Sequence, residues 1–569
     1  MNTIFKIKFF AVASIVAMCF LASSCVDNDG DQVASVTNTL YDEITADKEL
    51  SDFVEVLKAC NIPSSKDDYN TIIDVADSLF NTSRVYTVWA PVNGSFNKDS
   101  LIARVAAGYR EDVMKTFVGS HVANFLKPAK GNFGKEGELI LMLNEKKLLF
   151  AGSYKEEDGY TFNGRRLKSV NNRVRNGIIH KLETASEYQY NIWEYIWIYS
   201  RDAQVYKVDS LVNYLYSFND TTFSEWMSIP GPIVNGAETY LDSVFLFDNE
   251  LLNKYGGVSA LNNEDSLYTF YMPTNEAWDK MIAQAEKHFN YVVTPTITDS
   301  VLVDSLREYY PRFNIIKYLT YSENEQVFVQ DKDSIMPAQC QGPRKRFARS
   351  DVEKNVVETK ELSNGTMKVV SEFPYSVFDL WHDTIRIEAE ALSYMDNDLT
   401  VDKNWVTKYT VYDKDINKKA GNKLSGSQYI VLGDDNNSFT DLYYYIPDVK
   451  SATYQVALIT VPKNIKSDKF DFSESLPSML KCYVYSYDPV SKENSYELLY
   501  EKDLMPKMDK IDTLYLPNLV TFPICEYNIV KDVDDYSAQI RIRSNHNKNK
   551  YDNSIRLDAI LLIPVEDAK

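Results

Sequence analysis

Two patterns of apolar and polar residues divide the chain. In the first part, apolar residues recur at helical spacing in stretches such as 40–57, and short apolar runs typical of buried strands lie between such stretches. After Pro374, alternating apolar and polar runs are separated by clusters of Asp, Asn, Gly and Ser, as in an antiparallel sandwich. We therefore expect an α+β chain with an all-β last part. Its strands are expected at 385–391, 428–433, 441–447, 452–457 and 554–564.

One segment of the first part occurs twice. Residues 87–96 are echoed by residues 269–278: each is a β-rich run ending in Pro, with Asn two residues later and an aromatic residue three further on. Pro fixes the end of a buried strand, Asn favours a turn or a helix cap, and the aromatic ring docks back on the core. The repeat predicts two copies of one domain.

The first copy resembles the fasciclin domain over residues 36–187. The resemblance rests on the strand at 87–96, an opening helix expected over 40–57, a central His121 within 117–122, and a closing segment at 176–182. In that closing segment, Asn-Gly is expected to make a hairpin turn into an alternating strand.

The second copy, residues 188–375, is more divergent. Its opening helix is expected at 192–196, its counterpart of the central histidine motif at 318–321, and its closing strand at 364–370. Neither histidine position is kept in this copy. The fasciclin resemblance implies adhesion and protein contact rather than chemistry.

Residues 376–569 are similar to galactose-binding-like jelly rolls, a group that includes many carbohydrate-binding modules. The similarity lies in the opening segment 387–390, the middle strands, and the closing segment 557–560. It implies a structural calcium ion on Glu388, Glu390 and Asp558, since carboxylate oxygens suit a hard cation. Two solvated acids and a hairpin aspartate are the alternative interpretation.

Sugar binding would need exposed aromatic rings. Candidates in the last part are Trp405, Tyr409, Tyr412 and the run Tyr443 to Tyr445. Alternate residues of a strand point to opposite faces, so the sequence alone selects no subset of these rings.

The N-terminus reads as a targeting segment, residues 1–24. Two lysines precede an apolar run from Phe9 to Ala22, which is too short for a permanent transmembrane helix. Residues 21–25 resemble a bacterial lipobox, which implies lipid attachment at Cys25. The acidic linker 25–35 resembles the tag that directs some Gram-negative lipoproteins to the outer face of the outer membrane. An ordinary secretory signal with an incidental cysteine is the alternative.

Composition narrows the function classes. A formal net charge of −20 disfavours nucleic acid as a partner. Beyond Cys25, four cysteines are spread too widely for a disulfide scaffold, although a bridge between Cys482 and Cys525 stays open. Phosphate-loop, nucleophile-elbow, zinc-protease and Rossmann motifs are missing from the sequence. We predict no catalytic residue, and interpret His121 and His180 as satisfied core or turn histidines.

We therefore expect a surface-exposed, non-enzymatic outer-membrane lipoprotein, held in the membrane through the Cys25 lipid. Its partner would be an extracellular glycan or protein, and it would be accessory to a glycan-uptake transporter complex. Two alternatives stay open: an adhesion protein that uses the fasciclin pair with the sandwich as a spacer, and a hydrolase hidden in the sandwich.

Overall fold

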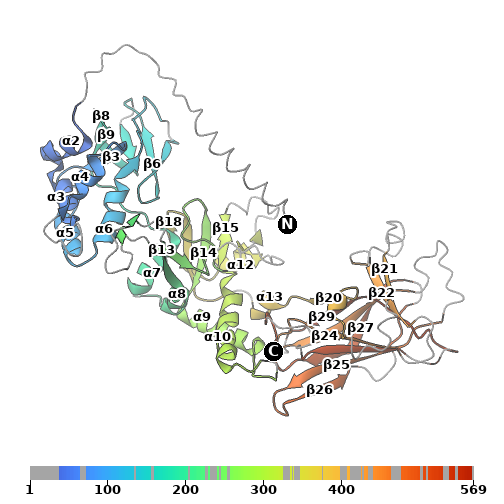
Figure 1. Ribbon diagram of the computed structural model, residues 1–569. Helices are drawn as coiled ribbons and strands as arrows, with labels where there is room; N and C mark the ends of the chain where they lie inside the picture. The colour runs from blue at the N-terminus through green and yellow to red at the C-terminus, as the bar shows by residue number, and fades with distance from the viewer. Residues whose placement is uncertain are drawn as a thin grey trace. The chain divides into compact units, whose positions relative to one another are not determined.

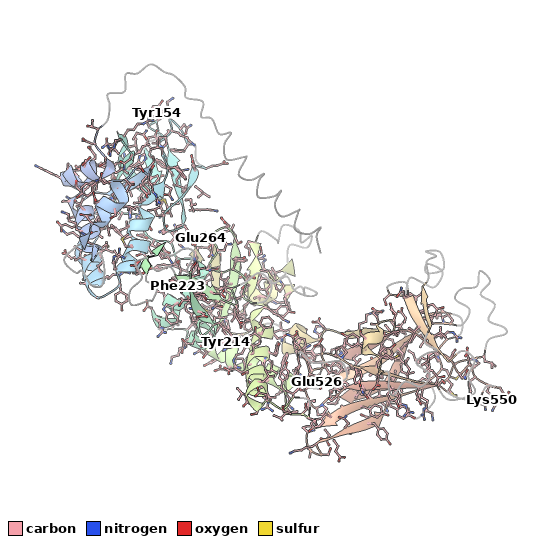
Figure 2. All side chains as sticks on the ribbon, viewed as in Figure 1. Tyr154, Tyr214, Phe223, Glu264, Glu526 and Lys550 are labelled. Carbon is pink, nitrogen blue, oxygen red and sulfur yellow. The ribbon has the colours of Figure 1, made fainter. Side chains whose placement is uncertain are left out.

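The computed structural model describes residues 37–566 except 64–71, 134–135, 156–158, 203–204, 225–228, 231–239, 243–244, 253–256, 296, 324–333, 336, 339–346, 374–375, 397–406, 411–423, 426–427, 434–439, 463–475, 500–503, 508–509, 530–536, 545–546 and 548. The chain divides into two compact units, Met1–Tyr188 and Gln189–Lys569. It mixes helices with many strands in several sheets (Figure 1), and Figure 2 adds the side chains to the same view.

The first unit is built on a seven-stranded sheet in the order β4-β3-β9-β8-β7-β6-β5. Its centre is a parallel pair, β3 (Tyr86–Pro91) beside β9 (Gly177–Leu182). The other strands are β4 (Val122–Asn124), β5 (Glu138–Leu141), β6 (Lys147–Gly152), β7 (Tyr160–Phe162) and β8 (Arg165–Val174). Alternate residues of β3 enter different apolar clusters: Val88 packs with the helices, and Trp89 packs with β6 and β7. A strand covered on both faces reads as a continuous apolar run.

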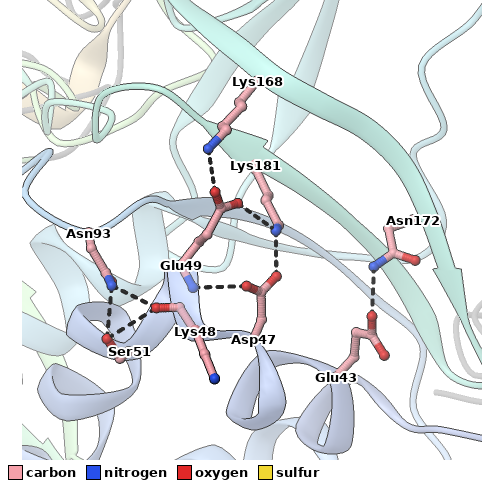
Figure 3. Close-up of polar contacts among 9 residues, drawn as sticks. All are labelled: Glu43, Asp47, Lys48, Glu49, Ser51, Asn93, Lys168, Asn172 and Lys181. Carbon is pink, nitrogen blue, oxygen red and sulfur yellow. Dashed lines mark hydrogen bonds and ion pairs between the residues drawn. The ribbon is translucent and has the colours of Figure 1, made fainter.

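The expected opening helix over 40–57 is broken in the structure. It forms α2 (Leu40–Ala46), the 3-10 turn η1 (Lys48–Leu50) and α3 (Ser51–Ala59), with Asp47 capping the turn. Lys181 of β9 pairs with Asp47 at 2.5 Å and with Glu49 at 2.9 Å (Figure 3). The break therefore places two acids beside a sheet lysine, a tertiary contact that helical periodicity does not reveal.

The remaining elements of the first unit are the hairpin β1 (Ile62–Pro63) and β2 (Ile72–Ile73), α4 (Val75–Phe80), α5 (Lys98–Ala106), α6 (Arg110–Thr116) and the turn η2 (Val118–Ser120).

The second unit begins with a sheet of the same central topology, in the order β15-β14-β19-β18. Strand β14 (Tyr268–Pro273) runs parallel to β19 (Gly365–Val370), flanked by β15 (Thr320–Ser322) and β18 (Val356–Leu362). As in β3, proline is the last residue of β14. The helices are α7 (Ile192–Asp202), α8 (Asp209–Tyr216), α9 (Asn275–Ala285), α10 (Ser300–Ile316), α12 (Arg349–Glu353) and α13 (Val377–Trp381), with η3 (Glu286–His288). Small two-stranded antiparallel sheets are formed by β10 (Asn219–Phe223) with β13 (Phe245–Asn249), β11 (Ile229–Pro230) with β12 (Tyr240–Asp242), and β16 (Ser334–Ile335) with β17 (Phe347–Ala348).

The expected hairpin turn forms at Asn176-Gly177, but the glycine lies just after the turn rather than in it. In the β8-β9 hairpin Val174 pairs with Gly177, so Arg175 and Asn176 form the turn and Gly177 is the first residue of the strand. A Cβ at Gly177 would lie 2.3 Å from the carbonyl oxygen of Tyr86. Glycine is thus required by the close approach of the neighbouring strand rather than by the turn.

The rest of the second unit is a two-sheet sandwich, and each of the five expected runs contains a strand. One sheet has the order β21-β22-β29-β24-β27, with β20 also paired to β29, and the other has the order β23-β28-β25-β26. The strands are β20 (Ile385–Glu388), β21 (Thr407–Thr410), β22 (Gln428–Leu432), β23 (Asp441–Tyr445), β24 (Thr453–Thr460), β25 (Leu480–Asp488), β26 (Glu493–Leu498), β27 (Asp512–Thr521), β28 (Gln539–Ser544) and β29 (Ile555–Pro564), with the turn η4 (Leu392–Tyr394).

Side chains from both sheets form one apolar core with the preceding repeat. The sandwich also contacts the segment after α9. There, Phe289 and Tyr291 pack with Cys525 in a separate buried cluster, and Asn290 donates its side-chain amide to Pro523 O at 2.9 Å. The second repeat and the sandwich are therefore joined by packed side chains as well as by the backbone.

Candidate functional site

Outward-pointing tyrosines cover the sheet β23-β28-β25-β26. Along β25, Cys482 and Val484 are buried in the core, so Tyr483 and Tyr485 point to the opposite face. Tyr443 of β23 and Tyr496 of β26 flank them on that face. The ring centroid of Tyr485 lies 6.4 Å from that of Tyr443 and 5.8 Å from that of Tyr496. We call this surface the tyrosine face.

An arginine pair lies within the tyrosine face. Arg541 of β28 is in register with Tyr443 on one side and Tyr483 on the other, and its guanidinium carbon lies 5.3 and 5.2 Å from their ring centroids. Arg541 and Arg543 each donate two hydrogen bonds to the carboxylate of Asp441, at 2.6 to 3.0 Å.

Burial and charge act in opposite directions on Asp441. Burial by itself raises the pKa of this carboxyl, but the hydrogen bonds from Arg543 and Arg541 hold it below its ordinary value. The carboxylate is thus ionised and covered, while the side chain of Arg543 stays 31% exposed.

The structure shows which of the aromatic residues expected from the sequence point toward this face. Tyr443 points outward, whereas Tyr444 is a core residue that donates to Ala389 O at 2.5 Å. Tyr445 is nearly buried and donates to Asp396 at 3.0 Å. Trp405 and Tyr412 lie outside the described residues, as does the side chain of Tyr409.

Sequence reasoning did not single out most of the tyrosine face. Tyr483, Tyr485 and Tyr496 and the two arginines come from strands that were not expected. The signal was present, since Cys482-Tyr483-Val484-Tyr485 and residues 539–543 alternate strictly between apolar and polar or tyrosine positions.

The three expected calcium ligands are close to one another at one end of the other sheet. Asp558 is fully buried and accepts from Ser425 N at 3.2 Å. Ser425 also donates its hydroxyl to Glu388. Burial, together with the charges of Glu388 and Glu390, raises the pKa of Asp558 to about 7.

A cationic side chain already occupies this place. Arg386 Nε lies 2.5 Å from Glu388, and its Nη2 lies 3.4 Å from Asp558. Within the described ranges, no group of three His, Cys, Asp or Glu side chains is arranged to hold a metal ion. Calcium at Glu388, Glu390 and Asp558 therefore stays a prediction, and Arg386 is the side chain with which the ion would compete.

His121 and His180 are fully buried and hydrogen-bonded at both ring nitrogens. His121 donates from Nδ1 to Phe117 O at 2.7 Å and accepts from Ser186 N at 3.0 Å. His180 contacts Lys127 O at 3.0 Å and Asn171 N at 3.3 Å. Burial lowers the pKa of each imidazole to about 4. Both rings are therefore neutral parts of the fold.

Three cysteines lie in the part of the chain that the structure describes, Cys60, Cys482 and Cys525, and all three are free and buried. Cys482 and Cys525 are free and buried, so the bridge left open by the sequence is not formed. Cys25 lies outside the described residues. Among the helices that are described, none has the length and apolar character to cross a bilayer.

Comparison with solved structures returns weak likenesses. A pair of FAS1 domains from the insect cell adhesion molecule Fasciclin I is 11% identical, with a TM-score of 0.18 over 52% of this chain and 90% of that one. The module TmCBM61, solved with β-1,4-galactotriose, is 10% identical, with a TM-score of 0.15 over 29% of this chain and 81% of that one. The CBM22-1 and GH10 modules of a Clostridium thermocellum xylanase, solved with xylohexaose, are 10% identical, with a TM-score of 0.20.

The xylanase match covers 32% of this chain and only 28% of that enzyme. Neither a protein-family model nor a curated protein sequence matches this chain. Since these three TM-scores are far below 0.5, none of these likenesses assigns a function to this chain.

Proposed function

We propose that this protein is a non-enzymatic, lipid-anchored glycan-binding protein on the outer face of the outer membrane. In this proposal, two fasciclin-like domains, residues 36–187 and 188–375, carry a carbohydrate-binding sandwich, residues 376–569. The observation that carries the proposal is the tyrosine face.

Tyrosine rings on a sheet face suit sugars for a physical reason. A ring offers an apolar surface for the C–H face of a sugar, and its hydroxyl offers a hydrogen-bond partner. Tyr496 is 68% exposed and Tyr443, Tyr483 and Tyr485 are half-buried, so the rings are held in place without being covered. Neighbouring rings 5.8 to 6.4 Å apart present a continuous platform rather than a single contact.

Glycan binding is tested by comparing matched tyrosine variants on a polysaccharide array. Tyr485→Ala and Tyr496→Ala are expected to weaken retention by the array at least tenfold. The control is Tyr515→Ala, which removes a tyrosine that is 54% exposed on β27 of the other sheet. Equal binding by all three variants, or no binding by the unchanged chain, would refute the proposal.

The anchor is proposed from the sequence of residues 1–25, and Cys25→Ala tests it. Proteolysis of intact cells should cleave the unchanged protein, and the variant should lose cleavage or appear in the medium. Protection on intact cells would instead place the protein in the periplasm. We extend the proposal to a role accessory to a glycan-uptake transporter complex, which crosslinking on intact cells would test by recovery of an outer-membrane transporter.

One observation favours adhesion as a second candidate function. Phe125 is 73% exposed, with a left-handed backbone at φ +67°, and Leu126 beside it is 52% exposed. Phe125 N donates to Val85 O at 2.8 Å, so exposed Val85 extends the same patch. Large apolar groups held in strained backbone mark contact surfaces. Phe125→Gly should keep the fold and reduce cell attachment, and attachment equal to that of the unchanged chain would exclude this patch.

A further inference from the structure

Charge is distributed unevenly across the tyrosine face. The outward positions of its strands form cross-strand rows, and one row reads Asp441, Arg543, Lys481. The next row reads Tyr443, Arg541, Tyr483. Three cations therefore share these rows with one carboxylate. Among the described outward positions of the four strands, Asp441 is the only acid.

The exposed fractions of the charged side chains add to this excess of positive charge. The side chain of Asp441 is 7% exposed beneath its two arginines, whereas that of Arg543 is 31% exposed. Asp396, which borders the face, is also buried and accepts hydrogen bonds from Tyr445 and Gln539. Solvent therefore meets cations on this face, although the whole chain carries a net charge of −20.

One cross-strand pair in the row carries two like charges. Arg543 and Lys481 lie directly opposite each other on paired strands, and like charges in that position destabilise a sheet. The row keeps a net positive charge, because Asp441 offsets only one of the cations that share it and the next row. An anion placed between the two cations would relieve their repulsion.

We infer that the ligand of this face is an acidic glycan, whose anionic group lies against Arg543 and Lys481 while its sugar rings stack on Tyr485 and Tyr496. This inference rests on the proposed glycan-binding function and narrows its ligand class. Carboxylate and sulfate share the required chemistry, since a guanidinium pairs with either through two parallel hydrogen bonds.

Two matched polymer pairs test the inference on the purified chain by affinity electrophoresis. Polygalacturonate is compared with its methyl ester, and dextran sulfate with dextran. We expect each acidic polymer to bind at least tenfold more tightly than its neutral partner, and the preference to shrink as salt is raised. The two pairs also separate carboxylate from sulfate as the favoured group.

Lys481→Gln is the informative variant. It should abolish most of the acidic preference, yet leave the unfolding midpoint unchanged or raised, because it removes the like-charge pair. Lys115→Gln makes the same charge change on an exposed residue of the first unit and should bind like the unchanged chain. Loss of binding in both variants would indicate a general charge effect and overturn the inference.

The inference and the proposed function fail differently. Equal affinity for acidic and neutral partners, with Tyr496→Ala weakening both, would overturn the acidic ligand and leave glycan binding intact. Absence of binding to both polymer pairs and to the polysaccharide array would overturn both.

Discussion

Asn176 and Asn364 make the same three side-chain contacts in the two repeats. Asn176 accepts from Leu40 N at 2.8 Å and donates to Phe80 O and Thr82 O at 2.7 and 3.1 Å. Asn364 accepts from Ile192 N at 2.9 Å and donates to Leu261 O and Asn263 O at 2.7 and 3.1 Å. Each asparagine thus joins the first helix of its repeat to the segment that leads into the central strand.

Replacing either asparagine should destabilise its own unit. Asn176→Ala removes two buried hydrogen bonds and one part-buried hydrogen bond at roughly 1 kcal/mol each, so we expect the free energy of unfolding of the first unit to fall by about 3 kcal/mol. Hydrogen exchange, read unit by unit, would check this. Asn172→Ala, which removes one exposed contact to Glu43, is the control and should cost well under about 1 kcal/mol. Equal effects would contradict the role of Asn176.

Acid should weaken the first unit through its two histidines. Each imidazole titrates near pH 6.5 when unfolded and at about 4 when folded. Between these values the unfolded state binds more protons, so the free energy of unfolding falls as pH falls, by about 3 kcal/mol per histidine at pH 4. Denaturant titrations from pH 7 to 4 measure this slope.

The second repeat lacks both histidines, so we expect this loss of stability in acid to be confined to the first unit. Backbone pairing places Leu319 where His121 stands and Lys368 where His180 stands. His121→Gln and His180→Gln should lower stability at pH 7 but flatten the pH slope of the first unit. An unchanged slope in both variants would assign the acid sensitivity to other groups.

Asp441 should be essential to the sandwich when both arginines are present. Asp441→Asn leaves two guanidinium groups side by side with a neutral partner, and we expect a loss of about 3 kcal/mol in the free energy of unfolding of the second unit. Adding Arg543→Gln should recover part of that loss, because it removes one of the two cations. A double-mutant cycle read by thermal unfolding measures this coupling, and strictly additive effects would contradict it.

Arg386 should compete with calcium at Glu388, Glu390 and Asp558. In the unchanged chain we expect calcium to raise the unfolding midpoint of the second unit only slightly, since the guanidinium already offsets the carboxylates. Arg386→Gln should bind calcium and show a larger rise. Asp558→Asn in the same background should remove that rise, and a rise that persists would place the ion elsewhere.

The repeat could be predicted from the sequence because it depends on neighbouring residues within one strand. A strand buried on both faces must be continuously apolar, and its end is marked by Pro91 or Pro273 in both copies. The break after Ala46 was not expected, because the helical spacing of the apolar residues hides the local cap, in which the Asp47 side chain accepts from Glu49 N at 2.9 Å. The reason for Gly177 was also hidden, because the constraint comes from Tyr86 across a parallel pair.

The candidate site shows the same division. Alternation placed Tyr444 and its neighbours on a strand but could not say which rings faced solvent. Arg541 meets Asp441 only through the register of β23 and β28, which are separated by about a hundred residues of chain. Contacts that depend on register are set by the whole sandwich rather than by a local pattern.

The buried cluster of Phe289, Tyr291 and Cys525 has a mechanical consequence. A pull on the tyrosine face would be transmitted to the second repeat through packed side chains in parallel with the backbone after α13. The sandwich is thus packed against the second repeat and is not connected to it by the backbone alone. Cutting the chain at residue 376 would expose apolar side chains on both fragments. The boundary between the two compact units, after Tyr188, is therefore the better place to divide the chain.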